Sequence, residues 1–528
     1  MRRHRLLFLN GMKFNTRFFR KCYKGFVLSI CQAVIAVTML SLFMTSPLHA
    51  AGQLRAGAAK VDISHPDTLP VNDPPYVKAL VLKDDTTTAV VITMDVVSIG
   101  MIGTVPNDYM DKIRAKLKAD LGIPPHTLLV NTSHCHASIC GDIDAKTVEC
   151  VKAAWAKLEP VRGGPGSGYE DRISENRRFK LKSGKTADAR HAYSLPGDEE
   201  FAEVGPIDPQ IGLYRFDRMD GTTLAVIYNY AVHPIQQMPN GKNTADMTGF
   251  SSQVVEDCFG EDTTALFIQG CGGDINPALY KDVSAPRNAE TLGSLLGVST
   301  MKAARKIKPG EVGEFKIVSQ MMELPRADFA ERIDRLKAER DKLVASLGGT
   351  SQNFKTFLPL AVNHGLSKDY PSYYAHRYMH DRKLGRDDYD RLDAQNKQNM
   401  AAYLANIHTM EEITRVQTNI RLLELHQGQN VAAGKRTLDV ELMGLRLGDF
   451  RLLTFPGELT VQIGLNLKQA DMRPNTFIAG YTNGYIYYAP TAEQLRNPGA
   501  AQEDCDTLLA PEWQEMFEKR ALEMLKGL

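Results

Sequence analysis

A strand–helix–strand signal at residues 88–136 constrains the fold more than any other feature of this chain. Residues 88–94 form an apolar run, residues 107–121 have helical character, and residues 128–132 form a second apolar run. Two apolar runs of strand length on either side of a helix predict an α/β unit. We therefore expect an α/β fold in which helices flank a mixed β-sheet core.

Two histidines follow the second apolar run. Side chains alternate between the faces of a strand, so we expect His134 and His136 to point the same way. Ligands of α/β sheets bind at the carboxyl ends of strands. Two imidazoles at that edge form half of a metal site, although loop histidines without a ligand give the same pattern. A metal site would need further ligands from elsewhere in the chain.

Three later segments place polar side chains beside apolar runs. His233 follows one such run, the glycine-rich segment 270–273 precedes Asp274 and Asn276, and Glu458 follows another run. The glycines allow either close approach of the backbone to a ligand or only a tight turn. We expect Glu458 to begin a helix, where the helix dipole favours a carboxylate with or without a ligand.

The remaining segments suggest how the core is interrupted. About fifty glycine-rich and charged residues after position 158 predict a long surface loop. Arg177 lies in this segment, and from the residues alone we expect it to be a solvated surface charge. Residues 325–435 change to helical patterns and predict a helical insertion that covers the core. The core is expected to resume after residue 435.

The N-terminal fifty residues have the layout of a secretory signal peptide. Several arginines and lysines precede an apolar run over residues 26–44, and small residues follow at 50–51. We predict a signal peptide over residues 1–50 and an exported remainder, periplasmic or secreted; an uncleaved membrane anchor is the alternative. The net charge of +1 and the charged content of 24% give no reason to expect a nucleic-acid partner.

The order of the motifs resembles the neutral/alkaline, non-lysosomal ceramidase family. The resemblance rests on residues 57–63, 131–136, 231–234, 244–246, 272–277, 456–458 and 483–488. It implies a ceramidase-like catalytic domain over residues 51–528. Members of this family are zinc-dependent amidases that hydrolyse the N-acyl bond of ceramide to a fatty acid and a sphingoid base.

The resemblance also implies a site. Carried over position by position, it gives four zinc ligands: His134, His233, Glu458 and Tyr488. Tyr485 and Tyr487 stand beside the last of these and remain alternatives to it. His136 is implied to lie next to the metal, and Arg177 corresponds to a family arginine that faces the site.

Two departures from the family pattern affect the expected chemistry. The family's serine falls on Asn276, and an amide is no nucleophile; this position is expected to donate a hydrogen bond to a developing oxyanion instead. We expect His136, or as second choice Asp274, to protonate the leaving amine. The family's C-terminal immunoglobulin-like domain is expected to be absent.

We therefore predict an exported amidase that acts on ceramide or a related N-acyl lipid through a zinc-activated water. One alternative is a zinc hydrolase of the same fold for another amide or ester, such as an N-acylated sugar. Another is a non-catalytic exported binding protein. Contact with a membrane surface and the oligomeric state stay open.

Overall fold

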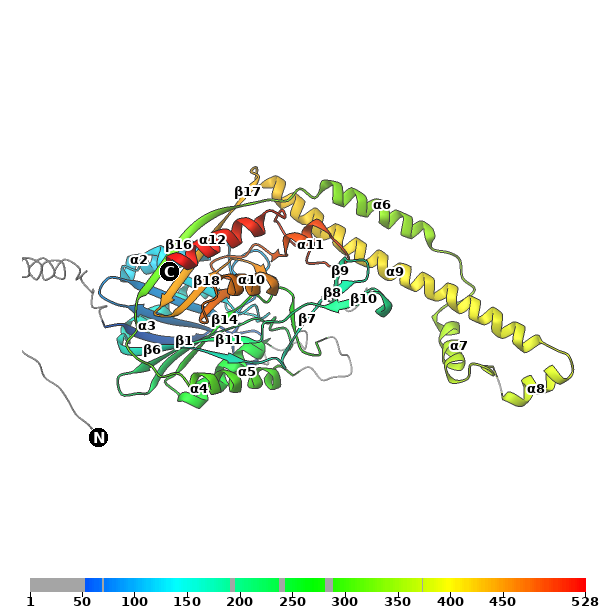
Figure 1. Ribbon diagram of the computed structural model, residues 1–528, viewed down its shortest axis with the longest axis horizontal. Helices are drawn as coiled ribbons and strands as arrows, with labels where there is room; N and C mark the ends of the chain where they lie inside the picture. The colour runs from blue at the N-terminus through cyan, green and yellow to red at the C-terminus, as the bar shows by residue number, and fades with distance from the viewer. Residues whose placement is uncertain (1–52, 69–70, 190–194, 237–242, 281–287, 373) are drawn as a thin grey trace, which may run out of the picture. The chain divides into compact units, whose positions relative to one another are not determined.

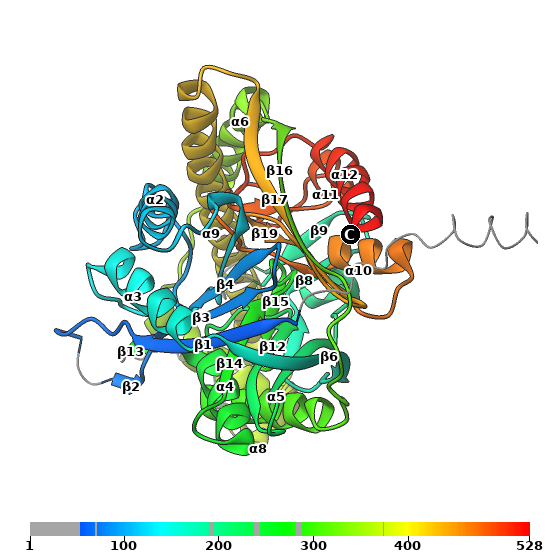
Figure 2. The same ribbon diagram turned by 90° about the vertical axis from the view of Figure 1, so that its left-hand side faces the viewer.

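Two β-sheets that share one apolar interior form the centre of the fold (Figures 1 and 2). The larger sheet has eight strands in the order β14 (Thr264–Gln269), β12 (Thr223–Tyr230), β11 (Gln210–Arg218), β6 (Glu159–Tyr169), β1 (Arg55–Asp62), β3 (Tyr76–Lys83), β4 (Thr88–Met94) and β5 (Leu128–Thr132). The smaller has β16 (Phe315–Pro325), β17 (Thr437–Leu447), β18 (Phe450–Thr454) and β20 (Thr476–Ala479). Both sheets mix parallel and antiparallel pairs.

This computed structural model describes residues 53–68, 71–189, 195–236, 243–280, 288–372 and 374–528. The predicted signal peptide lies outside these residues. Short paired strands complete the β-structure: β2 (Val71–Asp73) with β13 (Asn243–Thr244), β7 (Ser174–Asn176) with β15 (Ile275–Pro277), β8 (Arg178–Leu181) with β9 (Thr186–Asp188) and β10 (Phe201–Val204), and β19 (Glu458–Leu459) with β21 (Tyr488–Ala489). Two 3-10 turns lie in the connections between described elements: η1 (Pro125–Thr127) between α2 and β5, and η2 (Asp198–Glu200) between β9 and β10.

Helices cover the outer face of each sheet. On the larger sheet, α2 (Tyr109–Leu121) and α3 (Ile143–Ala156) pack on one half, and α4 (Asp246–Phe259) and α5 (Ala289–Ala304) pack on the other. On the smaller sheet, α10 (Val461–Asp471) and α12 (Trp513–Gly527) form the cover, and α11 (Ala492–Arg496) lies between them in sequence. The layers are helix, sheet, sheet and helix, which confirms the predicted α/β fold with a mixed sheet.

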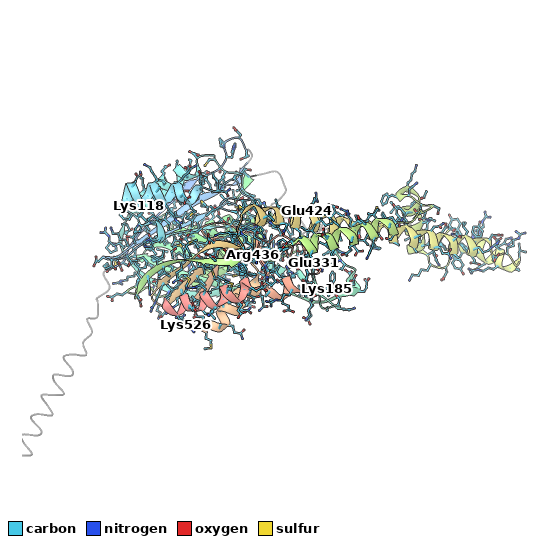
Figure 3. All side chains as sticks on the ribbon, turned by 90° about the horizontal axis from the view of Figure 1, so that it is seen from above. Lys118, Lys185, Glu331, Glu424, Arg436 and Lys526 are labelled. Atoms are coloured by element: carbon cyan, nitrogen blue, oxygen red, sulfur yellow. The ribbon has the colours of Figure 1, made fainter. Side chains whose placement is uncertain are left out.

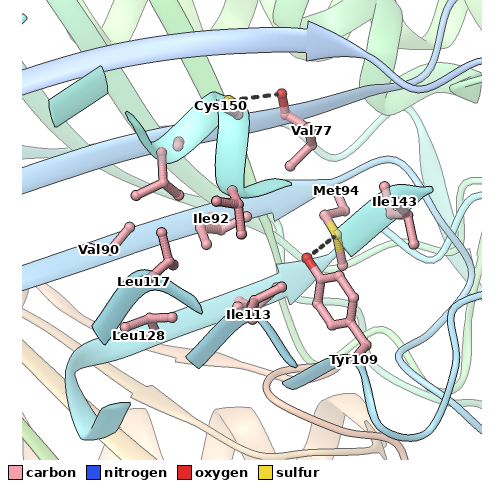
Figure 4. Close-up of a cluster of buried hydrophobic side chains, with 14 of the residues drawn as sticks. Val77, Val90, Ile92, Met94, Tyr109, Ile113, Leu117, Leu128, Ile143 and Cys150 are labelled. Atoms are coloured by element: carbon pink, nitrogen blue, oxygen red, sulfur yellow. Dashed lines mark hydrogen bonds between the residues drawn. The ribbon is translucent and has the colours of Figure 1, made fainter. Parts of the chain in front are cut away.

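The apolar runs in the sequence arise because the strands of the larger sheet are buried on both faces. In β3, Val77 and Val81 join the cluster under α2 and α3, whereas Leu80 and Leu82 face the smaller sheet. Figure 4 shows part of the first cluster, in which the hydroxyl of Tyr109 donates to the sulfur of Met94 at 3.1 Å. Each such aliphatic side chain contributes about 1.5–3 kcal/mol when it is removed from water.

The larger sheet curls so that its two edge strands, β5 and β14, contact each other. The backbone amide of Gln269, at the end of β14, donates to the Asn131 side chain of β5 at 2.7 Å. Strands that are far apart in the sheet order therefore end close together. This closure brings together the segments that follow β5 and β12.

The glycine-rich segment after residue 158 is not the surface loop that its composition predicts. Its first part is β6, which pairs along its length with β11. A Cβ atom at Gly163 would lie 2.6 Å from the Tyr214 ring, and one at Gly166 would lie 2.7 Å from the Ile307 side chain. The glycines thus make room for neighbouring side chains inside the protein, and they do not mark a flexible connection.

The predicted helical insertion consists of four helices between β16 and β17: α6 (Ala330–Ser346), α7 (Phe354–Leu366), α8 (Ala375–Lys383) and α9 (Asp388–Ala432). It does not cover the core as expected. Within the described residues after position 52, α6 and α9 form a long hairpin whose far end carries α7 and α8, and that end projects away from the sheets (Figures 1 and 3). No helix among the described residues is long and apolar enough to cross a membrane.

We expect Gly166→Val to destabilise the protein, because the added side chain would overlap Ile307. Overpacking of this kind costs about 1–3 kcal/mol of unfolding free energy, which urea denaturation would measure. Gly141→Ala is the matched control, since its Cβ would meet no atom within 4 Å. Equal stability of both variants would contradict the packing role assigned to β6.

Candidate metal centre

Three buried side chains converge where β5, β12 and β18 end. They are His134, His233 and Glu458, and one ligand atom of each lies within 4.8 Å of the others. Nε2 of His134 lies 3.5 Å from Oε1 of Glu458, and Nε2 of His233 lies 3.0 Å from Oε2. All three are at most 3% exposed. Residues that the sequence separates by more than 300 positions thus form one cluster.

His134 lies in the loop after β5. Its φ of 69° is left-handed, and its backbone amide donates to Val96 at 3.0 Å. The strand alternation predicted for residues 134–136 therefore does not apply: β5 ends at Thr132, and His136 is exposed. The turn nevertheless keeps the two imidazoles together, with ring centres 5.6 Å apart.

Hydrogen bonds fix the tautomer of both candidate histidine ligands. Nδ1 of His134 lies 2.7 Å from the Val97 carbonyl, and Nδ1 of His233 lies 2.6 Å from the Gly272 carbonyl. A carbonyl can only accept, so each Nδ1 carries the proton and each Nε2 has a free lone pair. Burial lowers the pKa of His134 to about 4 and also lowers the pKa of His233, where Arg177 adds to the effect. Both imidazoles are neutral at pH 7, as metal ligands must be.

Glu458 does not begin a helix, as its position after an apolar run predicts. It lies in the short strand β19, beside β21, and α10 starts three residues later. The hydroxyl of Tyr481 donates to Oε2 of Glu458 at 3.1 Å, and the hydroxyl of Tyr485 donates to Oε1. Burial opposes ionisation, but the two histidines and Tyr485 hold the pKa of this carboxyl well below its usual range. Glu458 is a carboxylate.

The three residues fit a zinc ion. Zinc takes histidine nitrogen and carboxylate oxygen at about 2.0–2.2 Å, so neighbouring ligand atoms of a tetrahedral site lie about 3.3 Å apart. Each imidazole nitrogen faces a different oxygen of the Glu458 carboxylate, at 3.5 Å and 3.0 Å, and one ligand atom from each of the three residues lies within 4.8 Å of the others. Two neutral imidazoles and one carboxylate leave a coordination position open, which is typical of catalytic zinc.

The tyrosines of residues 481–488 differ in their contacts. Tyr488 accepts a hydrogen bond from Arg177 at 3.0 Å, and its ring stacks on that of His233 at 6.5 Å. The Tyr487 hydroxyl accepts a hydrogen bond from Gln429, near the C-terminal end of α9. Tyr485 touches Glu458 directly. The assignment of Tyr488 as fourth ligand stays a prediction, and Tyr485 lies as close to the three-residue cluster.

Arg177 is not the solvated surface charge that the local sequence predicts, because it is only 3% exposed. Its guanidinium lies 3.5 Å from Nε2 of His233 and donates to the Gly273 carbonyl at 2.7 Å. Glu503, fully buried, accepts from Nε of Arg177 at 2.7 Å and so orients the guanidinium. The arginine implied by the family resemblance therefore lies beside a candidate metal ligand, His233.

Asn276 and Asp274 lie on either side of this arginine. Oδ1 of Asn276 accepts from Arg177 at 3.3 Å, while its buried Nδ2 has no acceptor among the described residues. Asp274 points elsewhere: its carboxylate accepts from the backbone amide of Val461, at the start of α10, at 2.7 Å and from Asn176 at 3.1 Å. Burial, with Glu503 next, raises its pKa to about 6.

The glycine-rich turn after β14 packs closely against the backbone of another segment of the protein. A Cβ at Gly273 would lie 2.6 Å from the Glu458 carbonyl oxygen, and the Gly273 amide donates to the Leu459 carbonyl. The glycines do allow a close approach of the backbone, which is one of the two interpretations of this segment. The group approached is the strand that carries Glu458, not a ligand. The turn leads into β15.

Gln269 holds the two histidine segments together, and no local pattern in the sequence indicates this role. Its Nε2 donates to the Ser133 carbonyl at 2.8 Å and to the Val232 carbonyl at 2.6 Å. These carbonyls belong to the residues immediately before His134 and His233. Glu503, Tyr481 and Tyr485 were also not indicated by the residues alone, because their partners are distant in sequence.

Comparisons with known proteins define the fold of the chain. No protein-family model and no curated protein sequence matches it. Four chains of solved structures match. Neutral ceramidase from Pseudomonas aeruginosa is 17% identical, with a TM-score of 0.55, and a ceramidase complexed with C2 is 17% identical, with a TM-score of 0.56. Each alignment covers 90% of this chain and 75% of the other. The chain has a ceramidase-like fold.

We expect Gln269→Leu to weaken zinc binding about 10–100-fold, the usual effect of losing a residue that orients metal ligands. It would also leave two buried carbonyls without a donor, at about 1–3 kcal/mol each. Isothermal titration calorimetry and urea denaturation would measure both losses. Gln462→Leu is the control, since this glutamine is exposed and its amide donates to Asn466 on its own helix. Zinc affinity equal to that of the wild type would contradict the role of Gln269.

Asp274→Asn tests the raised pKa of this carboxyl. A folded-state pKa of about 6, above the usual 3.8, means that its contribution to stability is present below pH 3.8 and is lost as the pH rises through 6. Relative to the wild type, the variant should therefore gain about 1 kcal/mol between pH 5 and pH 8. Thermal denaturation across this range would measure the difference, and a constant difference would contradict the shift.

Proposed function

We propose that this chain is an exported, zinc-dependent amidase that hydrolyses the N-acyl amide bond of ceramide or a related N-acyl lipid. The observation that carries the proposal is the buried group of His134, His233 and Glu458, which could hold a metal ion and lies in a ceramidase-like fold. Export rests on the sequence of residues 1–50 alone.

The residues around this group can each perform one part of an amide hydrolysis. Zinc held by the two histidines and Glu458 would polarise the amide carbonyl and lower the pKa of a bound water to about 7. Arg177, beside His233, supplies a buried positive charge where negative charge develops on the carbonyl oxygen. Asn276 adds Nδ2 as a second donor, since its Oδ1 is already occupied by Arg177.

A proton must reach the leaving amine, because an amide anion is too poor a leaving group to depart. His136 is the better of the two candidates: it is exposed, and its ring lies 5.6 Å from that of His134. Asp274 has a pKa suited to proton transfer, but its carboxylate bonds the backbone amide of Val461 and the side chain of Asn176. We therefore assign general-acid catalysis to His136.

Asn276 in place of the family's serine also favours a second candidate, a zinc hydrolase for another amide or ester. Without a hydroxyl at this position, the chain's own residues offer no serine nucleophile there, and substrates that need one would be excluded. An N-acylated sugar would use the same zinc, arginine and amide donors. The two functions differ in the group that leaves, which an assay can identify.

The test is an assay of the purified full chain loaded with zinc, using short-chain and long-chain ceramides, an N-acylated glucosamine and an acyl ester. We expect release of sphingoid base, and we expect His134→Ala and His233→Ala to lower zinc affinity at least about 100-fold and to remove activity. His408→Ala, at an exposed histidine on α9, is the control. Release of amine from the sugar alone would support the second candidate, and full zinc occupancy in both histidine variants would contradict the site.

A further inference from the structure

The far end of the helical hairpin carries an apolar surface that the protein leaves uncovered. On α7, Phe354, Leu358, Val362 and Leu366 are between 47% and 82% exposed. They recur every fourth residue, which turns each about 40° from the one before. The four side chains therefore form one continuous stripe along the helix. Single exposed apolar residues need no explanation, whereas a contiguous surface of them marks an interaction site.

A second face of α7 is already occupied. Phe357 packs its ring against Tyr403 of α9 at a centre distance of 4.9 Å. A capping box stabilises the N-terminus of the helix: the side chains of Asn353 and Thr356 each accept a hydrogen bond from the other's backbone amide. α7 is thus an ordered helix attached along one side, with its second apolar side free.

The charged residues within the segment that carries the stripe are lysines. Between Asp341 and Asp369 the chain contains no Asp or Glu, while Lys342, Lys355 and Lys368 are spread along this segment. Lys355 and Lys368 are exposed at the two ends of α7. Exposed lysines that flank an apolar helix face can keep their ammonium groups in water while their stems lie on an apolar surface. A partner with an anionic surface and an apolar interior is complementary to both the lysines and the apolar stripe.

We propose that α7 is an interfacial helix that binds an anionic lipid bilayer, with its apolar stripe inserted among the acyl chains and its lysines among the headgroups. The composition favours a bilayer over a protein partner, since protein interfaces are depleted in lysine and concentrate their binding energy in Trp, Tyr and Arg, with Leu and Val under-represented. The position of α7 at the end of the hairpin leaves it accessible to a flat surface (Figures 1 and 3). This proposal stands independently of the proposed reaction.

The first test is cosedimentation of residues 51–528, the chain without the predicted signal peptide, with vesicles of phosphatidylcholine alone or with about 30 mol% phosphatidylserine. We expect the protein to partition onto the anionic vesicles and to be released by salt. The double variant Leu358→Asp and Leu366→Asp should lower partitioning at least about tenfold on both kinds of vesicle. The double variant Lys355→Glu and Lys368→Glu should do so only on the anionic ones. Met516→Asp, at an exposed position of α12, is the matched control and should bind like the wild type.

A second measurement reports insertion directly. Val362→Trp places an indole in the stripe, and its fluorescence should shift to shorter wavelength and resist aqueous quenchers when anionic vesicles are added. Equal vesicle binding by wild type and the aspartate variant would overturn the proposal, and so would the absence of binding by the wild type. A wild-type dimer that the aspartate substitutions convert to monomer, without any change in vesicle binding, would assign the stripe to a second copy of this chain.

Discussion

The candidate metal centre depends on one buried side-chain amide. Gln269 lies at the end of β14 and donates to the carbonyls that precede His134 and His233, while its backbone amide bonds Asn131. The two histidines come from β5 and β12, which are far apart in the order of the sheet. Only the curl of the sheet brings these strand ends together, and the Gln269 side chain fixes their separation. The histidine loops have no direct backbone hydrogen bond that would replace this bridge among the contacts of the described residues.

Charge balance explains why the centre suits a divalent cation. Arg177 and Arg178 are buried with Glu503 and Asp504, so these four side chains largely compensate one another. The carboxylate of Glu458 contacts two imidazoles of lowered pKa and two phenols, none of which is positively charged at pH 7. A buried carboxylate surrounded by neutral groups is costly unless a cation joins it. A metal ion would therefore complete the electrostatics as well as the coordination of this cluster.

The sequence reveals those parts of the fold and site that depend on neighbours in the chain. Apolar runs predicted the strands before His134 and His233, because burial on both faces requires such runs. Composition gave the wrong prediction where glycine is required by packing. In β6, predicted to be part of a surface loop, Gly163 makes room for the Tyr214 ring. Composition was wrong again for Arg177, since the partner that allows its burial, Glu503, is 326 residues away. The match to a family arginine indicated Arg177 when the local residues did not.

The helical hairpin divides into a base that belongs to the core and an end that does not. At the base, His426 of α9 bonds Asp506 at 2.7 Å, and Gln429 bonds Tyr487. Tyr487 directly precedes Tyr488, the predicted fourth ligand, in the sequence. Leu423 packs there with Phe329 and Cys505. No residue of α7 is buried, and its ring contact is with α9. Changes at the base therefore act on folding and on the site together. Changes on the exposed stripe of α7 leave these contacts at the base intact.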